Sequence, residues 1–534
     1  MEYAIECIND ETGCNDRRHI DESHEIQEQF TKSISNRKYS NESSKNNFHK
    51  PQNIIINPQE NNDIKNYEYD TTCIKKIIAL LSEGTTLISE WNELNESEKF
   101  ETASKWVREK FVNLPESLIP TVIGGLFPNS NENLIDEMPE WLDREKFMRG
   151  QRFARDYFFG IFFAELLSLF TLFSFENGLK PLIITGKSSE PYTAFTRYLS
   201  TANRVRHWYT SDPWTKGTAA YNDIKIVNKK HQNIRNKLRN LTNKEIDKAG
   251  SIDKIWAPTR DVLIEDFRSL CPADKPGQCP YLIGDLSENV TSRLSQGDMA
   301  ATQCGFFGLI ILYPEAFGIH SATDEDLDAF CHLWRGLGYL LGIQDRYNFA
   351  NGTLDEVKQR SRDFLHMWVK PNFRNITPEW EHMMRCLVTG LHYYFPGTTY
   401  EVSLLYLAEL MGLEMPRFQS SLSYYNKMQY NMVKLVMKYP YRWSIVRNML
   451  NKRVDNHMDR ALDFDNKKHS ELREKSSKTM SQVVKEKYNN NDKINDNKLP
   501  IIEAKYSQYK IIGVLMVITQ CLILWRVTPI SALI

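Results

Sequence analysis

The stretch that decides the fold reads RYLSTANRVRHW at residues 197–208 and, after a turn-rich segment, IKIVNKKHQNIRNKL at residues 224–238. In the first segment Arg197 and Thr201 stand four residues apart, so a helix projects both side chains from one face. In the second segment, apolar residues and one histidine recur at intervals of three and four: Ile224, Val227, His231, Ile234 and Leu238. The spacing predicts two helices, the second with His231 directed inward and its basic residues facing solvent.

Helical spacing of the same kind extends over most of the chain from residue 67 to residue 462, interrupted by prolines and turn-rich loops. Alternating strand patterns bounded by Asn-Gly or Asp-Gly turns are few. No repeat with the period of a solenoid or propeller is evident. We therefore predict an all-α domain over residues 67–462, which is long enough for one large hydrophobic core.

The stretch YFFGIFFAELLSLFTLFSF, at residues 157–175, is long and apolar enough to resemble a membrane span. Its one carboxylate, Glu165, would be costly in lipid but needs only a partner in a soluble core. Arg149, Arg152 and Arg155 lie upstream and are the partners that we expect. We interpret this stretch as a buried core helix.

Two polar segments flank the predicted domain. Residues 1–66 are rich in Asn, Ser, Glu and Lys and cannot bury enough apolar area to offset chain entropy, so we predict a disordered arm. Residues 463–508 are dominated by Lys, Asn, Asp, Glu and Ser. That composition is typical of a charged linker or of an exposed charged helix.

The last segment, residues 509–534, contains the continuous apolar run IIGVLMVITQCLILW at residues 511–525. Fifteen residues are fewer than the ~20 that span a bilayer comfortably, although a thin membrane or the apolar residues that follow would close the gap. We predict a C-terminal membrane anchor rather than a buried core helix, because a polar segment leads into the run. Lys505 and Lys510 precede it, which places the main domain on the cytosolic side.

Composition and motifs exclude several classes of function. The 67 Lys and Arg residues are balanced by 68 Asp and Glu residues, so no net field favours nucleic acid. The nine cysteines include no CxxC pair and predict neither a zinc site nor a disulfide framework. The chain also lacks HExxH, GxSxG, GxxxxGK[ST] and a GxGxxG after a strand, so zinc hydrolases, serine hydrolases and nucleotide binders have no support.

An inward histidine on an amphipathic helix is usually a satisfied core residue. His231 has a second interpretation in addition to that of a core residue, because a polar Arg/Thr face precedes this histidine within an apolar helical domain. A helical protein builds a haem pocket in this way, with one axial imidazole and polar donors opposite. His207, between Arg206 and Trp208, is a second candidate ligand, although we interpret it as a residue at the end of a loop.

The order of these segments resembles a known family. Arg197 and Thr201, a histidine thirty residues later, the segment QGDMAATQ at 296–303 and the segment WRGLGYLLGIQD at 334–345 follow one another. This arrangement is similar to the family of the bacterial rubber oxygenase (latex clearing protein), which also contains a fungal oxygenase bound to the endoplasmic reticulum. The resemblance covers roughly residues 141–449.

The resemblance implies an all-α protein with a globin-like core that holds haem b. It implies His231 as the proximal iron ligand, and Arg197 and Thr201 as residues of the distal pocket. It also implies oxidative cleavage of carbon–carbon double bonds in an isoprenoid chain. The rubber oxygenase has a lysine where this chain has Ser200, and Glu165 is the one candidate for its catalytic base.

Our leading hypothesis is therefore a haem b-dependent oxygenase that is anchored in the membrane of the endoplasmic reticulum, with its main domain facing the cytosol. Its partners would be a hydrophobic, isoprenoid or lipid-like substrate, dioxygen and the membrane. A second hypothesis is a non-catalytic haem or lipid binder of the same fold. A third is a tail-anchored helical adaptor without a cofactor.

Overall fold

The computed structural model describes residues 94–129, 137–239, 241–273, 294–397 and 399–491, all of which belong to one compact unit. The predicted polar arm at 1–66 and the predicted anchor at 509–534 lie outside these residues. Every regular element that the structure describes is a helix, and the backbone pairing between Pro128 and Ser295 is an isolated bridge. The prediction of an all-α protein is confirmed.

The helices have the following bounds. In chain order the α-helices are α4 (Glu96–Lys110), α5 (Ile119–Gly124), α6 (Arg144–Asp156), α7 (Phe158–Leu172), α8 (Glu176–Ile184), α9 (Pro191–Thr210), α10 (Ala219–Arg239), α11 (Asn243–Ala249), α12 (Arg260–Leu270), α13 (Gln296–Leu312), α14 (Asp324–Leu340), α15 (Leu354–Phe364), α16 (Lys370–Phe373), α17 (Pro378–Leu391), α18 (Tyr400–Leu410), α19 (Pro416–Ser421), α20 (Tyr424–Lys438), α21 (Ser444–Leu462) and α22 (Asn466–Asn491). The short 3-10 or π segments are η2 (Glu116–Leu118), η4 (Pro314–Phe317), η5 (Asp345–Tyr347), η6 (Leu365–Val369) and η7 (Pro440–Arg442).

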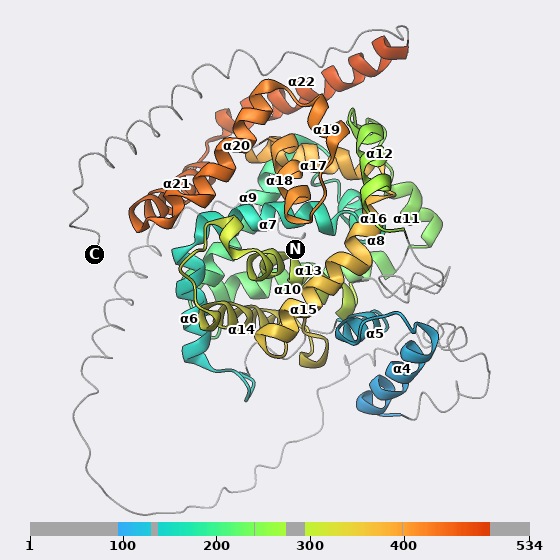
Figure 1. Cartoon of the computed structure of the whole chain (residues 1–534), viewed down its shortest axis with the longest axis vertical. Coiled ribbons are helices and arrows are strands. Elements are labelled where there is room, and N and C mark those ends of the chain that lie inside the picture. The colour runs from blue at the N-terminus through green and yellow to red at the C-terminus, as the bar shows by residue number, and fades with distance from the viewer. Residues whose placement is uncertain (1–93, 130–136, 240, 274–293, 398, 492–534) are drawn as a thin grey trace, which may run out of the picture. The chain divides into compact units, whose positions relative to one another are not determined.

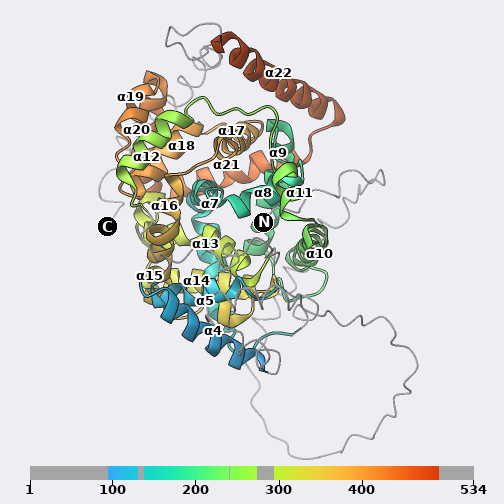
Figure 2. The same ribbon diagram turned by 90° about the vertical axis from the view of Figure 1, so that its right-hand side faces the viewer.

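Helix α13 occupies the centre of the packing (Figures 1 and 2). It contacts α7, α5, α14 and α15, and nearly all of its side chains are buried. Its start is defined by a capping box, in which Ser295 Oγ accepts from the Asp298 N–H at 3.1 Å and the Asp298 carboxylate accepts from the Ser295 N–H at 2.9 Å. A helix that is apolar on all sides needs neighbours on all sides, which explains its central position.

The apolar stretch at 157–175 forms the buried helix α7 and the turn after it, as we interpreted it from the sequence. Within the described residues no helix is both long and apolar enough to cross a membrane. The stretches at 197–208 and 224–238 lie in α9 and α10, so the two predicted helices are also confirmed. Residues 466–491 form α22, which contacts α9 through the hydrogen bond from the Tyr192 N–H to Ser476 Oγ at 3.1 Å.

Helices α6 and α14 approach closely because α6 has a glycine at the contact. A Cβ added at Gly150 would lie 2.3 Å from the carbonyl oxygen of Ala329, which is a backbone atom and cannot rotate away. Gly178 in α8 differs, since a Cβ there would meet no atom closer than 3.7 Å. The first glycine is therefore required by packing and the second is not.

We predict that Gly150→Ala lowers the free energy of unfolding by ~1–3 kcal/mol, because the added methyl group forces α6 away from α14. Gly178→Ala is the matched control and should leave stability unchanged or raise it slightly, since alanine favours a helix. Thermal or denaturant unfolding of the two variants measures the difference. Equal stability of both variants would contradict the close helix contact.

Candidate functional site

His231 lies on the inward face of α10 and is 2% exposed, as the spacing predicts. The neighbouring Asn228 side chain donates a hydrogen bond to the Leu340 carbonyl at 2.9 Å, which fixes this face of α10 against the end of α14. Burial lowers the pKa of His231 well below its usual value, and the positive charge of Arg235 lowers it further. The imidazole is therefore neutral at neutral pH, the form in which histidine binds a metal.

A cavity opens beside the imidazole. Its volume is about 30 Å³, which is room for a water molecule and far below the ~300–1,000 Å³ of small-molecule sites. Four helices, α9, α10, α13 and α14, contribute most of its wall. The lining residues are Trp208, Val227, His231, Met299, Thr302, Gln303, Phe306, Trp334, Gly338, Leu341 and Ile343.

Aromatic rings form the rigid part of this wall. Phe306 and Trp334 stack with their centroids 4.2 Å apart, and Trp208 meets Trp334 edge-to-face at 6.3 Å. Gln303 is held in place, because its Nε2 donates to the Trp334 carbonyl at 2.6 Å and its Oε1 accepts from the Phe349 N–H at 2.9 Å. The segments 296–303 and 334–345, which carry the resemblance, thus meet at the cavity that contains His231.

Trp208 contributes a polar group to this apolar wall. Its side chain is 4% exposed, and its indole N–H has no hydrogen-bond partner among the described residues. A buried donor without a partner typically costs ~1–3 kcal/mol. The cavity therefore favours a ligand that has a hydrogen-bond acceptor near Trp208.

Arg197 and Thr201 share one face of α9, but neither lines this cavity. Arg197 is fully buried and its Nη1 donates to Ser188 Oγ at 2.7 Å, while the Thr201 hydroxyl donates to the Arg197 carbonyl at 3.1 Å. Their assignment to a distal pocket stays a prediction. His207 lies in the last turn of α9, where its Nδ1 contacts a carboxylate oxygen of Asp223 at 2.8 Å.

Glu165 has a different partner from the one that we expected. The Tyr209 hydroxyl donates to Glu165 Oε1 at 2.9 Å. Arg149 instead pairs with Asp326 at 2.8 Å, and Arg152 and Arg155 are exposed. The expectation of an arginine partner is wrong because the three arginines share the solvent-facing side of α6, while Glu165 lies on α7 among apolar residues.

The pair of Glu165 and Tyr209 connects to the cavity through an aromatic ring. Desolvation raises the pKa of Glu165 to about 8, and the hydrogen bond from Tyr209 only partly offsets this. The Tyr209 ring packs edge-to-face against Trp334, with centroids 6.1 Å apart. We did not predict Tyr209 from the sequence; the signal was a carboxylate in an apolar helix, which requires a hydrogen-bond donor from another element.

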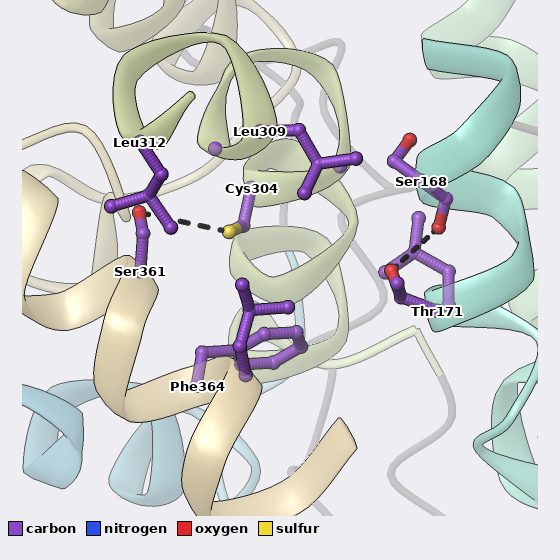
Figure 3. Close-up of a pocket in the computed structure, with 11 residues that line it drawn as sticks. Ser168, Thr171, Cys304, Leu309, Leu312, Ser361 and Phe364 are labelled. Atoms are coloured by element: carbon purple, nitrogen blue, oxygen red, sulfur yellow. Dashed lines mark hydrogen bonds between the residues drawn. The ribbon is translucent and has the colours of Figure 1, made fainter. Parts of the chain in front are cut away.

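A second cavity of about 10 Å³ lies on a different face of α13, between α7 and α15 (Figure 3). The Cys304 thiol donates a weak hydrogen bond to Ser361 Oγ at 4.0 Å, and Ser361 donates to the Val357 carbonyl at 2.8 Å. Burial raises the pKa of Cys304 to about 12. The thiol is therefore protonated at neutral pH and is not an activated nucleophile.

Among the described residues there is no group of three or more His, Cys, Asp or Glu side chains that could hold a metal ion. The absence of such a group concerns metal ions that are held by three or more side chains. A haem iron in a globin-like protein needs only one histidine ligand, so the absence does not test haem binding. The chain matches no protein family, no curated protein and no solved structure. The geometry around His231 is therefore the basis for a functional proposal.

We predict that Glu165→Gln stabilises the protein relative to wild type more at pH 8 than at pH 5. The pKa of Glu165 is raised to about 8 from 4.5, so its contribution to stability is fully present below pH 4.5 and is lost as the pH rises toward 8. Glutamine has no charge to bury and still accepts from Tyr209. The melting temperatures of both proteins should diverge by ~2 °C or more across this range.

The control is Glu109→Gln, at an exposed position of α4. It should shift the melting temperature equally at both pH values. If the melting temperatures of Glu165→Gln and wild type differ by the same amount at pH 5 and at pH 8, the carboxyl is ionised in the folded protein.

Proposed function

We propose that this protein is a haem b-dependent oxygenase that acts on a hydrophobic, isoprenoid or lipid-like substrate. The observation that carries the proposal is the position of His231, a buried neutral imidazole in a cavity with aromatic walls. The two segments that form much of this wall, 296–303 and 334–345, are the same segments that resemble the rubber oxygenase family.

The residues present have the chemistry that haem requires. A neutral imidazole is the form of histidine that binds iron, and Trp208, Phe306 and Trp334 would offer apolar surface to a flat macrocycle. Gly338 also lines the cavity, where a side chain would collide with the fixed amide of Gln303 at 2.3 Å. The space is small for a porphyrin, so binding requires the walls to move apart.

Each part of the site has a separate role in this proposal. Bound haem would supply the activation of dioxygen. His231 would hold the iron, and the Trp208 N–H would donate a hydrogen bond to an acceptor in the cavity. The aromatic wall would exclude water and favour an apolar substrate. By the resemblance, Arg197 and Thr201 would complete a distal pocket in a globin-like core.

Glu165 is better explained as a positioning residue than as a base that touches substrate. It does not line the cavity beside His231, and its link to that cavity runs through Tyr209 and Trp334. Its raised pKa keeps the carboxyl largely protonated at neutral pH. The pair of Glu165 and Tyr209 would therefore hold the Trp334 ring in place.

The proposal includes attachment to the endoplasmic reticulum through residues 509–534, with the main domain facing the cytosol. The apolar run at 511–525 and the lysines before it support this location. The second candidate function is a haem or lipid binder without catalysis, which Ser200 favours because the rubber oxygenase has a lysine there. A tail-anchored adaptor without a cofactor is the remaining alternative.

We predict that the protein purified with its native cofactor shows a Soret absorption band and that His231→Ala loses most of it. Removal of the imidazole takes away the axial ligand, and haem without it dissociates. His207→Ala is the matched control, since that imidazole is paired with Asp223 and partly exposed. Its spectrum should equal that of wild type. A band unchanged in His231→Ala would contradict the ligand assignment.

We predict further that the haem-loaded protein converts a polyunsaturated isoprenoid to carbonyl products in the presence of dioxygen. Mass spectrometry of carbonyl-derivatised products measures the reaction, with an anaerobic sample as control. Haem binding without carbonyl products would favour the non-catalytic binder, and absence of haem would favour the adaptor.

A further inference from the structure

The corner between α20 and α21 exposes an unusual amount of apolar surface. Five large apolar side chains within fifteen residues face solvent there, and single exposed apolar residues would need no explanation. They are Leu435 (46% exposed), Tyr439 (54%), Trp443 (45%), Ile445 (78%) and Met449 (47%). We refer to these five residues, on the end of α20, on α21 and beside η7, as the apolar corner (Figure 1).

The apolar corner is held firmly on the domain. Tyr441, in η7, is fully buried, and its hydroxyl accepts from the Gly160 N–H at 3.1 Å and lies 3.4 Å from Asn451 Oδ1. The turn itself is closed by the bond from the Trp443 N–H to the Pro440 carbonyl at 3.1 Å. Tyr441 thus fastens η7 to α7 while the rings on either side of it face outward.

Basic residues surround the apolar corner. Residues 422–454 contain seven Lys or Arg residues and no Asp or Glu. Five of the seven are exposed and form no ion pair with any described residue. Lys427 lies near the start of α20, and the four that lie within or next to the corner in sequence are Lys438, Arg442, Lys452 and Arg453.

Three carboxylates of α18 and α21 are engaged in ion pairs with other basic residues. Glu409 of α18 contacts Lys434 at 2.6 Å. Asp459 of α21 contacts Arg206 at 2.7 Å, and Asp455 contacts the same guanidinium at 3.6 Å. The basic residues around the corner therefore keep their charge available to a partner.

We propose that the apolar corner and its four basic residues dock on the surface of an anionic phospholipid bilayer. Tryptophan and tyrosine favour the headgroup region, where the ring is buried and its polar atom stays hydrated. Lysine and arginine reach the phosphates, and clusters of them are attracted to an anionic surface. The excess of basic residues without acids over residues 422–454 complements an anionic surface, and a protein partner is the alternative outcome of the test.

This inference depends neither on haem nor on the proposed C-terminal anchor. A bilayer bound at α20 and α21 would bring the domain to the phase in which hydrophobic substrates dissolve. It also gives the protein a charge-dependent contact with the membrane, distinct from the charge-independent insertion of an apolar run.

The test compares the full chain with Lys438→Glu/Arg442→Glu on vesicles of phosphatidylcholine with and without phosphatidylserine. Wild type should partition more strongly to vesicles that contain phosphatidylserine, and added salt should reduce the difference. The charge variant should lose ~10-fold or more of this partitioning. Its binding to neutral vesicles, which the run at 511–525 would provide, should stay the same.

A second variant, Ile445→Ser/Met449→Ser, should weaken partitioning to vesicles that contain phosphatidylserine. Matched controls are Lys105→Glu and Val112→Ser, at exposed positions of α4 and just after it, and both should behave as wild type. Melting temperatures equal to wild type confirm folding. The proposal is overturned if wild type and Lys438→Glu/Arg442→Glu partition equally at every salt concentration. That result would favour a protein partner for the apolar corner. If the first charge variant does not fold, Lys452→Glu/Arg453→Glu replaces it.

Discussion

The burial of α13 on all sides is the constraint on which the rest of the structure depends. Its sequence alternates bulky apolar residues with Gly305 and Gly308, so α7 and α15 pack on one part of its surface and α14 on another. Imperfect filling of this packing leaves both cavities described above. Most of the residues that form the wall near His231 therefore belong to the packed helices α9, α10, α13 and α14.

This arrangement separates two chemical environments within one helical domain. On one face of α13, a neutral imidazole and three aromatic rings surround a cavity, and the indole N–H groups of Trp208 and Trp334 are both buried without a hydrogen-bond partner among the described residues. On another face, a protonated thiol and a satisfied serine hydroxyl leave no reactive group. The haem proposal concerns the first environment, and the second is closely packed.

Local periodicity was sufficient to predict the helices and the burial of His231, because spacing of three and four residues is set by the helix itself. It was not sufficient for contacts between helices. The shared face of Arg197 and Thr201 was correctly predicted, yet the structure directs the Arg197 guanidinium to Ser188 and not to the cavity of His231. The partner of Glu165 lies on α9, forty-four residues further along the chain, where no local pattern could identify it.

The central claim is that His231 binds a haem iron within the cavity between α10, α13 and α14. Diffraction data collected at the iron absorption edge, from crystals of the protein purified with its native cofactor, locate the metal directly. Our account predicts one anomalous peak next to a ring nitrogen of His231, with the macrocycle against Phe306 and Trp334. A peak at any other residue, or no iron in a protein that retains its activity, would contradict it.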